Sequence, residues 1–263
     1  MKANYHTHTA RCHHAIGRDE DYVKSAIAAG FDELGFSDHT PWRYHSDFVS
    51  HMRMRLEKFQ DYKQSVLALK EKYRDQISIK LGLEVEYFPQ YMGWLREFLR
   101  QEQVDYIIFG NHYYLSDEKR VYFGTACVDE RFLELYCEQC IEGMESGLYS
   151  YLCHPELFMR GYPRFDERCE AIAYRICEAA KRLNIPLEYN LAGAAYNEIN
   201  HVHEYPHPRF WEIAREVGST AIIGSDAHHY EDLRNPYYWD KAQHYLDEVL
   251  QIKRIECLEC KGF

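Results

Sequence analysis

The feature that most restricts the fold of this chain is a repeated pattern, in which a short β-prone run ends in polar residues and a helical pattern follows. Seven such runs are expected: one leading into His6, and others at 33–36, 77–85, 104–109, 148–152, 185–189 and 219–223. Strands that alternate with helices are typical of a parallel α/β fold. The 263 residues contain no internal repeat and no linker rich in Pro, Gly or Ser, so we expect one domain over residues 1–263.

Helical patterns separate these runs. Hydrophobic periodicity and capping residues predict helices at about 18–30, 54–73, 89–101, 129–145 and 166–183. In a closed parallel barrel, the carboxyl ends of all strands open onto one face, so residues far apart in the sequence converge there. The alternative is an open doubly wound sheet, but that fold usually has a Gly-rich first turn, which this sequence lacks. We therefore expect a closed α/β barrel.

Potential metal ligands stand at the carboxyl ends of the runs. His6 and His8 are two residues apart on a strand, so both imidazoles point to the same face and can bind one ion. This spacing is a weak signal alone, but the other runs carry or precede further donors: Asp38, His39, Glu84, His112, His154, Asp226 and His228. So many donors predict two or three ions, with Glu84 as the bridge between a pair. Imidazole and carboxylate ligands together suit Zn, Mn or Fe(II).

The predicted chemistry is hydrolysis of a phosphoester. Closely spaced metal ions lower the pKa of a bound water and neutralise charge on a phosphoryl group. The chain carries 42 acidic and 31 basic residues, a formal net charge of -11, which disfavours nucleic acid as a partner. A phosphoester other than nucleic acid is therefore the expected substrate.

The sequence also bears on the compartment. The N-terminal residues lack the apolar core of a signal peptide, and no apolar run approaches the ~20 residues of a membrane helix. Nine cysteines, an odd number, favour reduced thiols, so we expect a cytoplasmic protein without membrane contact. Two pairs have the spacing of zinc ligands, but we interpret their members as half-buried helical cysteines: Cys137 with Cys140, and Cys257 with Cys260.

The motifs at the ends of the runs resemble those of the polymerase and histidinol phosphatase (PHP) superfamily, and they follow the same order along nearly the whole chain. They are His6-Thr7-His8, Ser37-Asp38-His39, Gly82-Leu83-Glu84, Gly110-Asn111-His112, Cys153-His154-Pro155 and Gly224-Ser225-Asp226-Ala227-His228. Within the superfamily, the chain is most similar to the histidinol-phosphate phosphatases. This narrower similarity depends on two segments, Cys12-His13-His14-Ala15 and Phe36-Ser37-Asp38-His39-Thr40-Pro41.

The resemblance implies a distorted seven-stranded (β/α) barrel, similar to a TIM barrel, that binds three divalent metal ions. The implied ligands are His6, His8, Glu84 and Asp226 for the first ion, Glu84, His112 and His154 for the second, and His14, His39 and His228 for the third. The implied reaction is hydrolysis of L-histidinol phosphate to L-histidinol and phosphate, a step of histidine biosynthesis. Candidates for the acid that protonates the leaving alkoxide are Asp38, Asp226 and His228.

Arg160 matches a phosphate-binding arginine of such phosphatases and could hold two phosphate oxygens at once. The sequence departs from the resemblance at one place. Related phosphatases commonly have a second phosphate-binding arginine after the sixth strand, whereas the segment from Asn190 to Asn197, around Ala195, contains none. Either the substrate differs from histidinol phosphate, or another cation takes this place, for which the candidates are Arg18, Arg43 and Arg209.

Two other functions fit the pattern less well. The acidic net charge disfavours a nuclease or proofreading module, and the complete set of donors disfavours a metal-binding barrel without activity. Several residues near the motifs are expected to have lesser roles. Glu86 is a competing ligand on the face of Glu84, and His13 and His229 are expected to be exposed or to support neighbouring ligands. Three further histidines occupy a polar loop: His201, His203 and His207.

Overall fold

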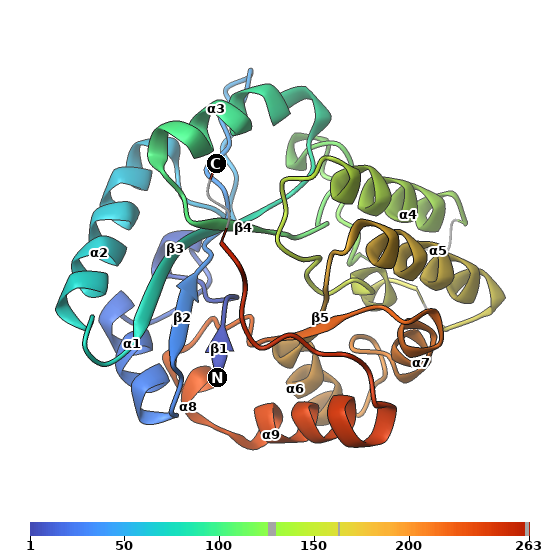
Figure 1. Ribbon diagram of the computed structural model, residues 1–263. Helices are drawn as coiled ribbons and strands as arrows, with labels where there is room; N and C mark the ends of the chain where they lie inside the picture. Colours follow the sequence, from blue (N-terminus) through green and yellow to red (C-terminus); the bar gives the residue numbers. More distant parts are fainter. Residues whose placement is uncertain (126–129, 163, 261–262) are drawn as a thin grey trace.

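The strands of the protein form a curled parallel sheet. The computed structural model describes residues 1–125, 130–162, 164–260 and 263, and in these residues it contains six strands: β1 (Ala3–Asn4), β2 (Glu33–Phe36), β3 (Ser78–Val85), β4 (Tyr106–Phe109), β5 (Leu187–Asn190) and β6 (Ala221–Gly224). Strands β1 to β4 pair in sequential order, and β5 pairs with β6. The strands lie near the centre of the molecule with the helices around them, as Figure 1 shows.

Single β-bridges connect the two sheets. Leu152 bridges to Phe109 at the end of β4 and to Leu187 at the start of β5, and Thr7, after β1, bridges to Ala227, after β6. These pairings join β4 to β5 through Leu152, and the end of β1 to the end of β6. The α/β class expected from the sequence is confirmed.

The expected strand at 148–152 is reduced to the bridges of Leu152, so the prediction of seven strands is not confirmed in the described residues. The main chain supplies a reason. A longer parallel ladder toward β5 would require an N–H donor at residue 186, but Pro186 has none. Leu152 N donates to Pro186 O and Glu188 N donates to Leu152 O, and these two bonds complete a single bridge.

The helices cover the outside of the sheet. In the described residues the longer ones are α1 (Asp19–Ala28), α2 (Phe59–Lys72), α3 (Met92–Glu102), α4 (Glu130–Glu145), α5 (Glu167–Leu183), α6 (Leu191–Asn200) and α7 (Pro208–Val217). Shorter elements follow β6: α8 (Tyr230–Arg234), α9 (Tyr237–His244) and a π-helical turn (Tyr245–Leu250). None of the described helices combines the length and the apolar composition that a membrane span requires.

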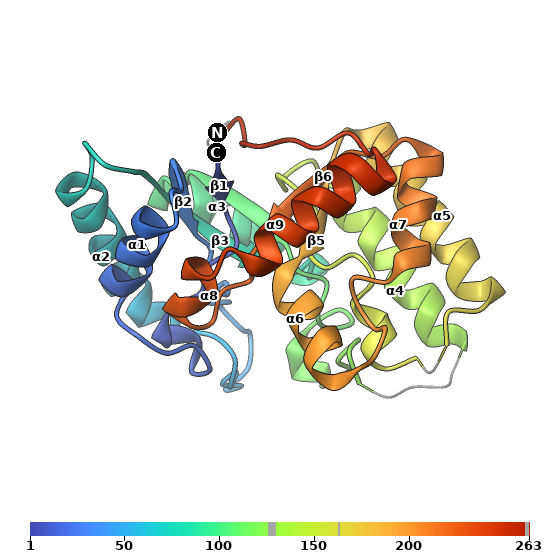
Figure 2. The ribbon, with the colours of Figure 1, turned by 90° about the horizontal axis from the view of Figure 1, so that it is seen from below.

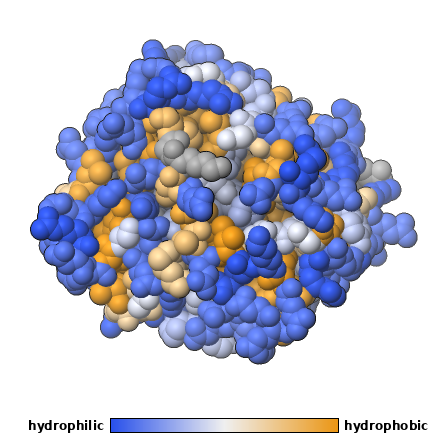
Figure 3. Space-filling model, in the orientation of Figure 1, coloured by the Kyte–Doolittle hydropathy of each residue, from blue (hydrophilic) through white to orange (hydrophobic). Residues whose placement is uncertain are grey.

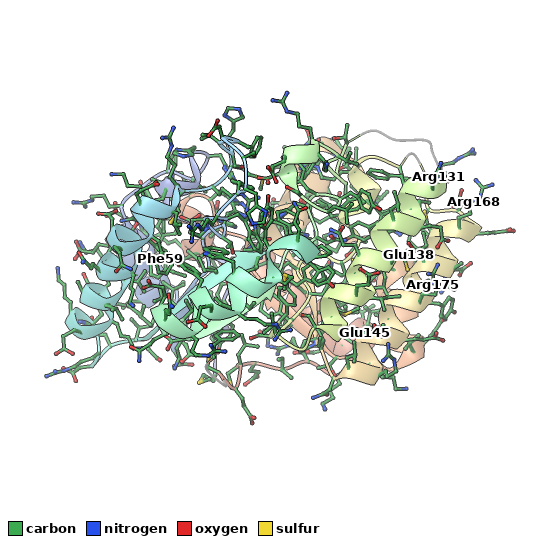
Figure 4. The ribbon with its side chains drawn as sticks, turned by 90° about the horizontal axis from the view of Figure 1, so that it is seen from above. Phe59, Arg131, Glu138, Glu145, Arg168 and Arg175 are labelled. Atoms are coloured by element: carbon green, nitrogen blue, oxygen red, sulfur yellow. The ribbon has the colours of Figure 1, made fainter. Side chains whose placement is uncertain are left out.

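The five expected helices are all present within a few residues of their predicted bounds. The beginnings of α2 and α3 differ most, because each is preceded by a 3-10 turn, Leu56–Lys58 and Pro89–Tyr91 respectively. Helices α4 and α5 lie side by side, with Arg131 and Arg168 at the same end of the pair (Figure 4). An ion pair of 2.7 Å between Arg182 and Glu145 joins the other end.

Two hydrophobic cores lie on opposite sides of the sheet, and β4 shows how one strand supplies both. Ile107 and Phe109 pack into the large core between sheet and helices. Tyr106 and Ile108 point to the other side and join a small core with Tyr5. This alternation is the two-residue period of a strand that is buried on both faces.

The two chain ends lie on the same side of the molecule, at the end of the sheet where β1 begins (Figure 2), although Figure 1 shows them well apart across that face. The N-terminal ammonium group is 2.9 Å from the Glu256 carboxylate, and Leu258 N donates to the Tyr5 hydroxyl. Hydrophobic residues are interspersed among hydrophilic ones on this face of the molecule (Figure 3). The motifs with the potential metal ligands are at the opposite, carboxyl ends of the strands.

Candidate metal centre

Glu84, near the end of β3, is the centre of a cluster of imidazoles. Its side chain is almost completely buried. One carboxylate oxygen, Oε1, lies 3.5 Å from His6 Nε2, 3.3 Å from His112 Nε2 and 3.1 Å from His154 Nε2; the other, Oε2, lies 3.6 Å from His8 Nε2 and 2.9 Å from His39 Nδ1. The five histidines follow three different strands, β1, β2 and β4, and the Leu152 bridge, so the curled sheet brings them together.

Asp226 provides a second carboxylate in the same cluster. Its Oδ1 atom lies 3.3 Å from His6 Nε2, 3.2 Å from His8 Nε2 and 3.4 Å from His228 Nδ1. The ring of His228 stacks on that of His8 at 4.1 Å and on that of His14 at 4.7 Å. Asp226 has a φ of 49°, a left-handed conformation that Asp adopts more readily than most residues.

Many of the buried donor atoms have no hydrogen-bond partner in the described structure. They are His6 Nε2, His8 Nδ1 and Nε2, His39 Nδ1, His154 Nδ1, His228 Nε2 and Glu84 Oε2. Buried polar atoms in proteins are nearly always paired, so such a concentration requires an explanation. Neutral imidazole nitrogens and carboxylate oxygens are the ligands of zinc and similar divalent ions. The residues present therefore fit divalent metal ions.

In the described residues, six groups of donor atoms are compact enough for one ion each, with their ligand atoms within 4.8 Å of one another. Three of them consist mainly of the expected ligands: His6, His8 and Asp226; His8, His39 and His228; and Cys12, His14 and His228. The first agrees with the expected first ligand set apart from Glu84, whose closest oxygen is 3.5 Å from His6. The expected third set of His14, His39 and His228 is divided between the other two groups.

Cys12 is the member of these three groups that sequence reasoning did not single out as a donor. Its side chain is fully buried, and the backbone N–H groups of His14 and Ala15 hydrogen-bond to it. The spacing Cys12-His13-His14 was the available signal, since it places a thiol two residues before a potential ligand. His13 itself is exposed, as predicted.

Two further carboxylates contact histidine ring nitrogens that face away from Glu84. Glu188 in β5 is fully buried; its Oε1 is 2.8 Å from His6 Nδ1, and its Oε2 accepts from His154 N and from Asn190 Nδ2. A carboxylate on the second ring nitrogen fixes the tautomer and orientation of a ligating histidine. Glu188 was not predicted from the sequence, although it shares a strand face with Asn190.

Glu86 supports His112 in a similar way. Its Oε1 lies 3.1 Å from His112 Nδ1, and both of its oxygens accept from the buried Arg53, at 2.9 and 2.7 Å. Arg53 also contacts Asp117 at 3.1 Å. Glu86 was considered as a competing ligand, but in the structure Arg53 and His112 occupy its oxygens.

The charges in the cluster act strongly on one another. Burial opposes the ionisation of Glu84, but His112, His6 and His39 outweigh it and hold the pKa of the carboxyl group well below its usual value. Burial lowers the pKa of His39 to about 3, despite the opposing charge of Glu84. A neutral imidazole beside an ionised carboxylate is the state in which both groups bind a metal ion.

Two motif glycines leave space for these carboxylates. A Cβ atom at Gly110 would collide with the Glu84 carboxylate, and one at Gly224 would collide with that of Glu188. Substitution at either position would displace a carboxylate that contacts a histidine of the cluster.

A cavity of about 390 Å³ opens beside the cluster. It is lined by His14, His39, Met52, Glu84, His112, Tyr122, His154, Leu157, Arg160, Ala192, Tyr196, Tyr205, Asp226 and His228. Arg160 is the one Lys or Arg among these lining residues. The three tyrosines of the cavity all interact with this arginine: the Arg160 guanidinium is 5.3 Å from the Tyr196 ring and also interacts with Tyr122 and Tyr205.

Comparison with known proteins identifies the family of this chain. The model of the PHP domain matches residues 4–192, which include the motifs from His6 to Asn190. The chain belongs to the PHP domain family. This match confirms the resemblance found in the sequence.

Relatives of this PHP domain carry names that refer to one activity. The protein named "Probable histidinol-phosphatase" of Deinococcus radiodurans is 26% identical over 229 residues, which cover 85% of each chain. The histidinol-phosphatase of Bacillus subtilis is 22% identical over 262 residues, which cover 90% of this chain and 97% of the relative.

A solved structure has a similar fold. The histidinol phosphate phosphatase of Lactococcus lactis, in complex with Zn, L-histidinol and phosphate, superposes with a TM-score of 0.72 at 19% identity and covers 98% of each chain. At this level of identity the similarity concerns the fold of the PHP domain.

Asp38 lies apart from the cavity of the PHP domain. It is fully buried behind His8, with Oδ1 3.8 Å from His8 Nδ1, and it accepts hydrogen bonds from the Thr9 hydroxyl and from His39 N. The other two candidates for the general acid, Asp226 and His228, do line the cavity.

Three arginines were candidates to replace the missing second phosphate-binding arginine, and they lie elsewhere in the PHP domain. Arg18 pairs with Asp21 on α1, and Arg43 is exposed. Arg209 pairs with Glu170, Glu212 and Glu216. None of the three is among the described residues that line the cavity.

The paired cysteines differ from the expectation. Cys137 and Cys140 do lie in helix α4, but both are fully buried rather than half-buried. Cys257 and Cys260 lie in the C-terminal segment after the π-helical turn, where the described residues form no helix, and Cys257 is exposed. The helical interpretation of the second pair is wrong, because the last helical turn ends at Leu250 and Gln251 adopts a left-handed conformation.

Proposed function

We propose that this PHP domain is a metal-dependent histidinol-phosphate phosphatase, which hydrolyses L-histidinol phosphate to L-histidinol and phosphate. The observation that carries the proposal is the cluster of unpartnered donors around Glu84 and Asp226, next to a cavity that contains Arg160. The names of the Deinococcus and Bacillus relatives and the ligands of the Lactococcus structure support the same substrate.

We propose two or three divalent ions, Zn, Mn or Fe, as cofactors, with zinc favoured by its presence in the Lactococcus structure. The proposed ligands are those implied by the family motifs: His6, His8, Glu84 and Asp226; Glu84, His112 and His154; and His14, His39 and His228. When bound, such ions polarise the phosphoryl group and supply a nucleophilic water at neutral pH.

The residues of the chain would then bind and orient the substrate. Arg160 is placed to hold phosphate oxygens through its guanidinium group. The tyrosines of the cavity wall, Tyr122, Tyr196 and Tyr205, would limit the access of bulk water. We favour Asp226 or His228 over Asp38 as the source of the proton for the leaving alkoxide, because only the first two line the cavity.

We make three broader proposals, on the domain organisation, the number of strands and the cellular location. Residues 1–263 act as one catalytic domain, and the barrel has seven strands, with the Leu152 segment between β4 and β5 as the seventh. The odd number of cysteines favours reduced thiols and therefore a cytoplasmic location.

Release of phosphate by the zinc-loaded protein tests the proposal. We expect hydrolysis of L-histidinol phosphate with a higher kcat/KM than that of glycerol phosphate or p-nitrophenyl phosphate, and no degradation of single-stranded oligonucleotides. The Asp226→Ala variant, which removes a carboxylate shared by three histidines, should lose turnover while its circular dichroism stays native. Faster hydrolysis of the other phosphomonoesters would overturn the substrate, and degradation of oligonucleotides would favour a nuclease.

A further inference from the structure

Glu204 lies next to Arg160, the arginine proposed to bind the phosphate group. Its Oε2 atom is 3.7 Å from Arg160 Nε, a distance that allows electrostatic attraction but is too long for a hydrogen bond. This Oε2 atom is buried and has no hydrogen-bond partner in the described structure. The carboxylate therefore has an unused acceptor atom within a few ångströms of the proposed phosphate site.

The position of Glu204 is fixed by its neighbours. Its backbone N–H donates to the Asn197 side chain at 2.9 Å, which ties the loop to helix α6. The next residue, Tyr205, lines the cavity and is mostly buried. Glu204 is not itself among the residues that line the cavity, but it lies directly beside two that are, Arg160 and Tyr205.

A carboxylate at this place is unfavourable for a simple phosphate ester. It repels the phosphate dianion and weakens the attraction of Arg160, the one Lys or Arg among the described residues that line the cavity. The cost is larger because the segment around Ala195 provides no second arginine. Such a carboxylate becomes favourable when the substrate itself carries a cation close to its phosphate.

We propose that Glu204 binds the ammonium group of an aminoalkyl phosphate and so determines the substrate class. This inference rests on the proposed phosphatase function and deepens it. In a substrate whose amine is two carbons from the ester oxygen, the phosphate can contact Arg160 while the ammonium group donates to Glu204 Oε2. L-Histidinol phosphate has this arrangement, whereas polyol phosphates do not.

The alternative role of Glu204 is to orient Arg160. An orienting residue would affect the binding of every phosphate ester, but an ammonium acceptor affects only the substrates that carry the amine. Pairs of substrates that differ in this one group separate the two roles.

The experiment compares L-histidinol phosphate with its deamino analogue imidazolylpropyl phosphate, and phosphoethanolamine with ethyl phosphate, on the zinc-loaded enzyme. We expect the wild type to prefer the amine in each pair. Glu204→Gln should lower kcat/KM roughly 10- to 100-fold for the amines, mostly through KM, and leave the deamino analogues within about twofold. Glu198→Gln is the matched control, since Glu198 pairs with Lys241 outside the cavity.

Each result decides between the roles. An equal loss for both members of a pair would make Glu204 an orienting residue, and no loss for either would remove it from the site; both overturn the inference. A preference for phosphoethanolamine without hydrolysis of histidinol phosphate would keep the inference and reject the proposed substrate. Absence of any phosphomonoesterase activity would reject the proposed function and the inference together.

Discussion

At the scale of single residues, the centre depends on carboxylates that touch histidines from two sides. Glu84 and Asp226 contact the ring nitrogens that face the cluster, and Glu188 and Glu86 contact the far nitrogens of His6 and His112. Each of these two rings therefore has a carboxylate near both of its nitrogens. This arrangement orients the donors before any ion binds, which favours affinity.

The first prediction concerns Glu188. Substitution by Gln keeps the shape of the side chain but removes the charge that holds His6 Nδ1–H, so we expect zinc affinity to fall about 10- to 100-fold. Competition between the metal-free protein and a zinc indicator measures this affinity. Glu178→Gln, on an exposed position of α5, is the control. Equal zinc affinity of the variant and the wild type would rule out a positioning role for Glu188.

The second prediction concerns Arg160. Lys keeps the positive charge but cannot hold two phosphate oxygens in a planar fork, so Arg160→Lys should lower kcat/KM for the phosphate ester about 10- to 100-fold. Steady-state phosphate release is the measurement. Arg164→Lys, which changes an exposed arginine nearby in the sequence, should behave as the wild type. If both variants retain full activity, Arg160 does not bind the phosphate.

At the scale of elements, a buried ionic network connects the end of β3 to two segments beside the cavity. Arg53 lies before α2, is only 2% exposed, and contacts Glu86 just after β3. On its other side it contacts Asp117, which also accepts from the Tyr44 hydroxyl. The network holds these segments against the sheet where His112 is positioned.

The third prediction tests this network. Arg53→Met removes the only described arginine partner of two buried carboxylates, so we expect the free energy of unfolding to fall by ~3–5 kcal/mol. Urea denaturation followed by circular dichroism measures the change. The control is Arg55→Met, at an exposed position two residues later. A loss no larger than that of the control would show that the network contributes little to stability.

The elements were largely predictable because local sequence dictates them. The run at 33–36 coincides with β2, and the periodicity of 166–183 gave α5 to within one residue. The run at 148–152 looked like the others, but its pairing depends on Pro186 in a different segment, which the run itself does not show. Helix α6 was not predicted, since the first half of Leu191–Asn200 contains a glycine and several small residues that resemble a loop.

At the scale of the whole molecule, the candidate site was predictable as a set of residues but only partly as a geometry. Position at the end of a strand was sufficient to identify the histidines around Glu84, because parallel strands deliver such residues to one face. It could not identify Glu188 or Glu204, whose roles follow from contacts across the sheet and across a loop. It also placed Asp38 with the ligands, although the structure buries this carboxylate behind His8.

The fourth prediction concerns removal of the metal ions. Donors buried without partners should make the metal-free protein less stable, and an ion at about 100 times its Kd adds ~2.7 kcal/mol to the free energy of unfolding. We expect chelation to lower Tm and abolish phosphate release, and added Zn²⁺ to restore both. Magnesium is the control, because it prefers oxygen ligands. Equal Tm with and without Zn²⁺ would contradict a metal centre at this position.

The positions of the chain ends have a practical consequence. Both ends lie on the side of the molecule where β1 begins (Figure 2), whereas the cavity is lined by residues that follow the carboxyl ends of the strands. A surface or a fused protein attached at either end would leave the entrance to the cavity turned outward. Immobilised enzyme anchored through one end should therefore admit substrate as readily as enzyme in free solution.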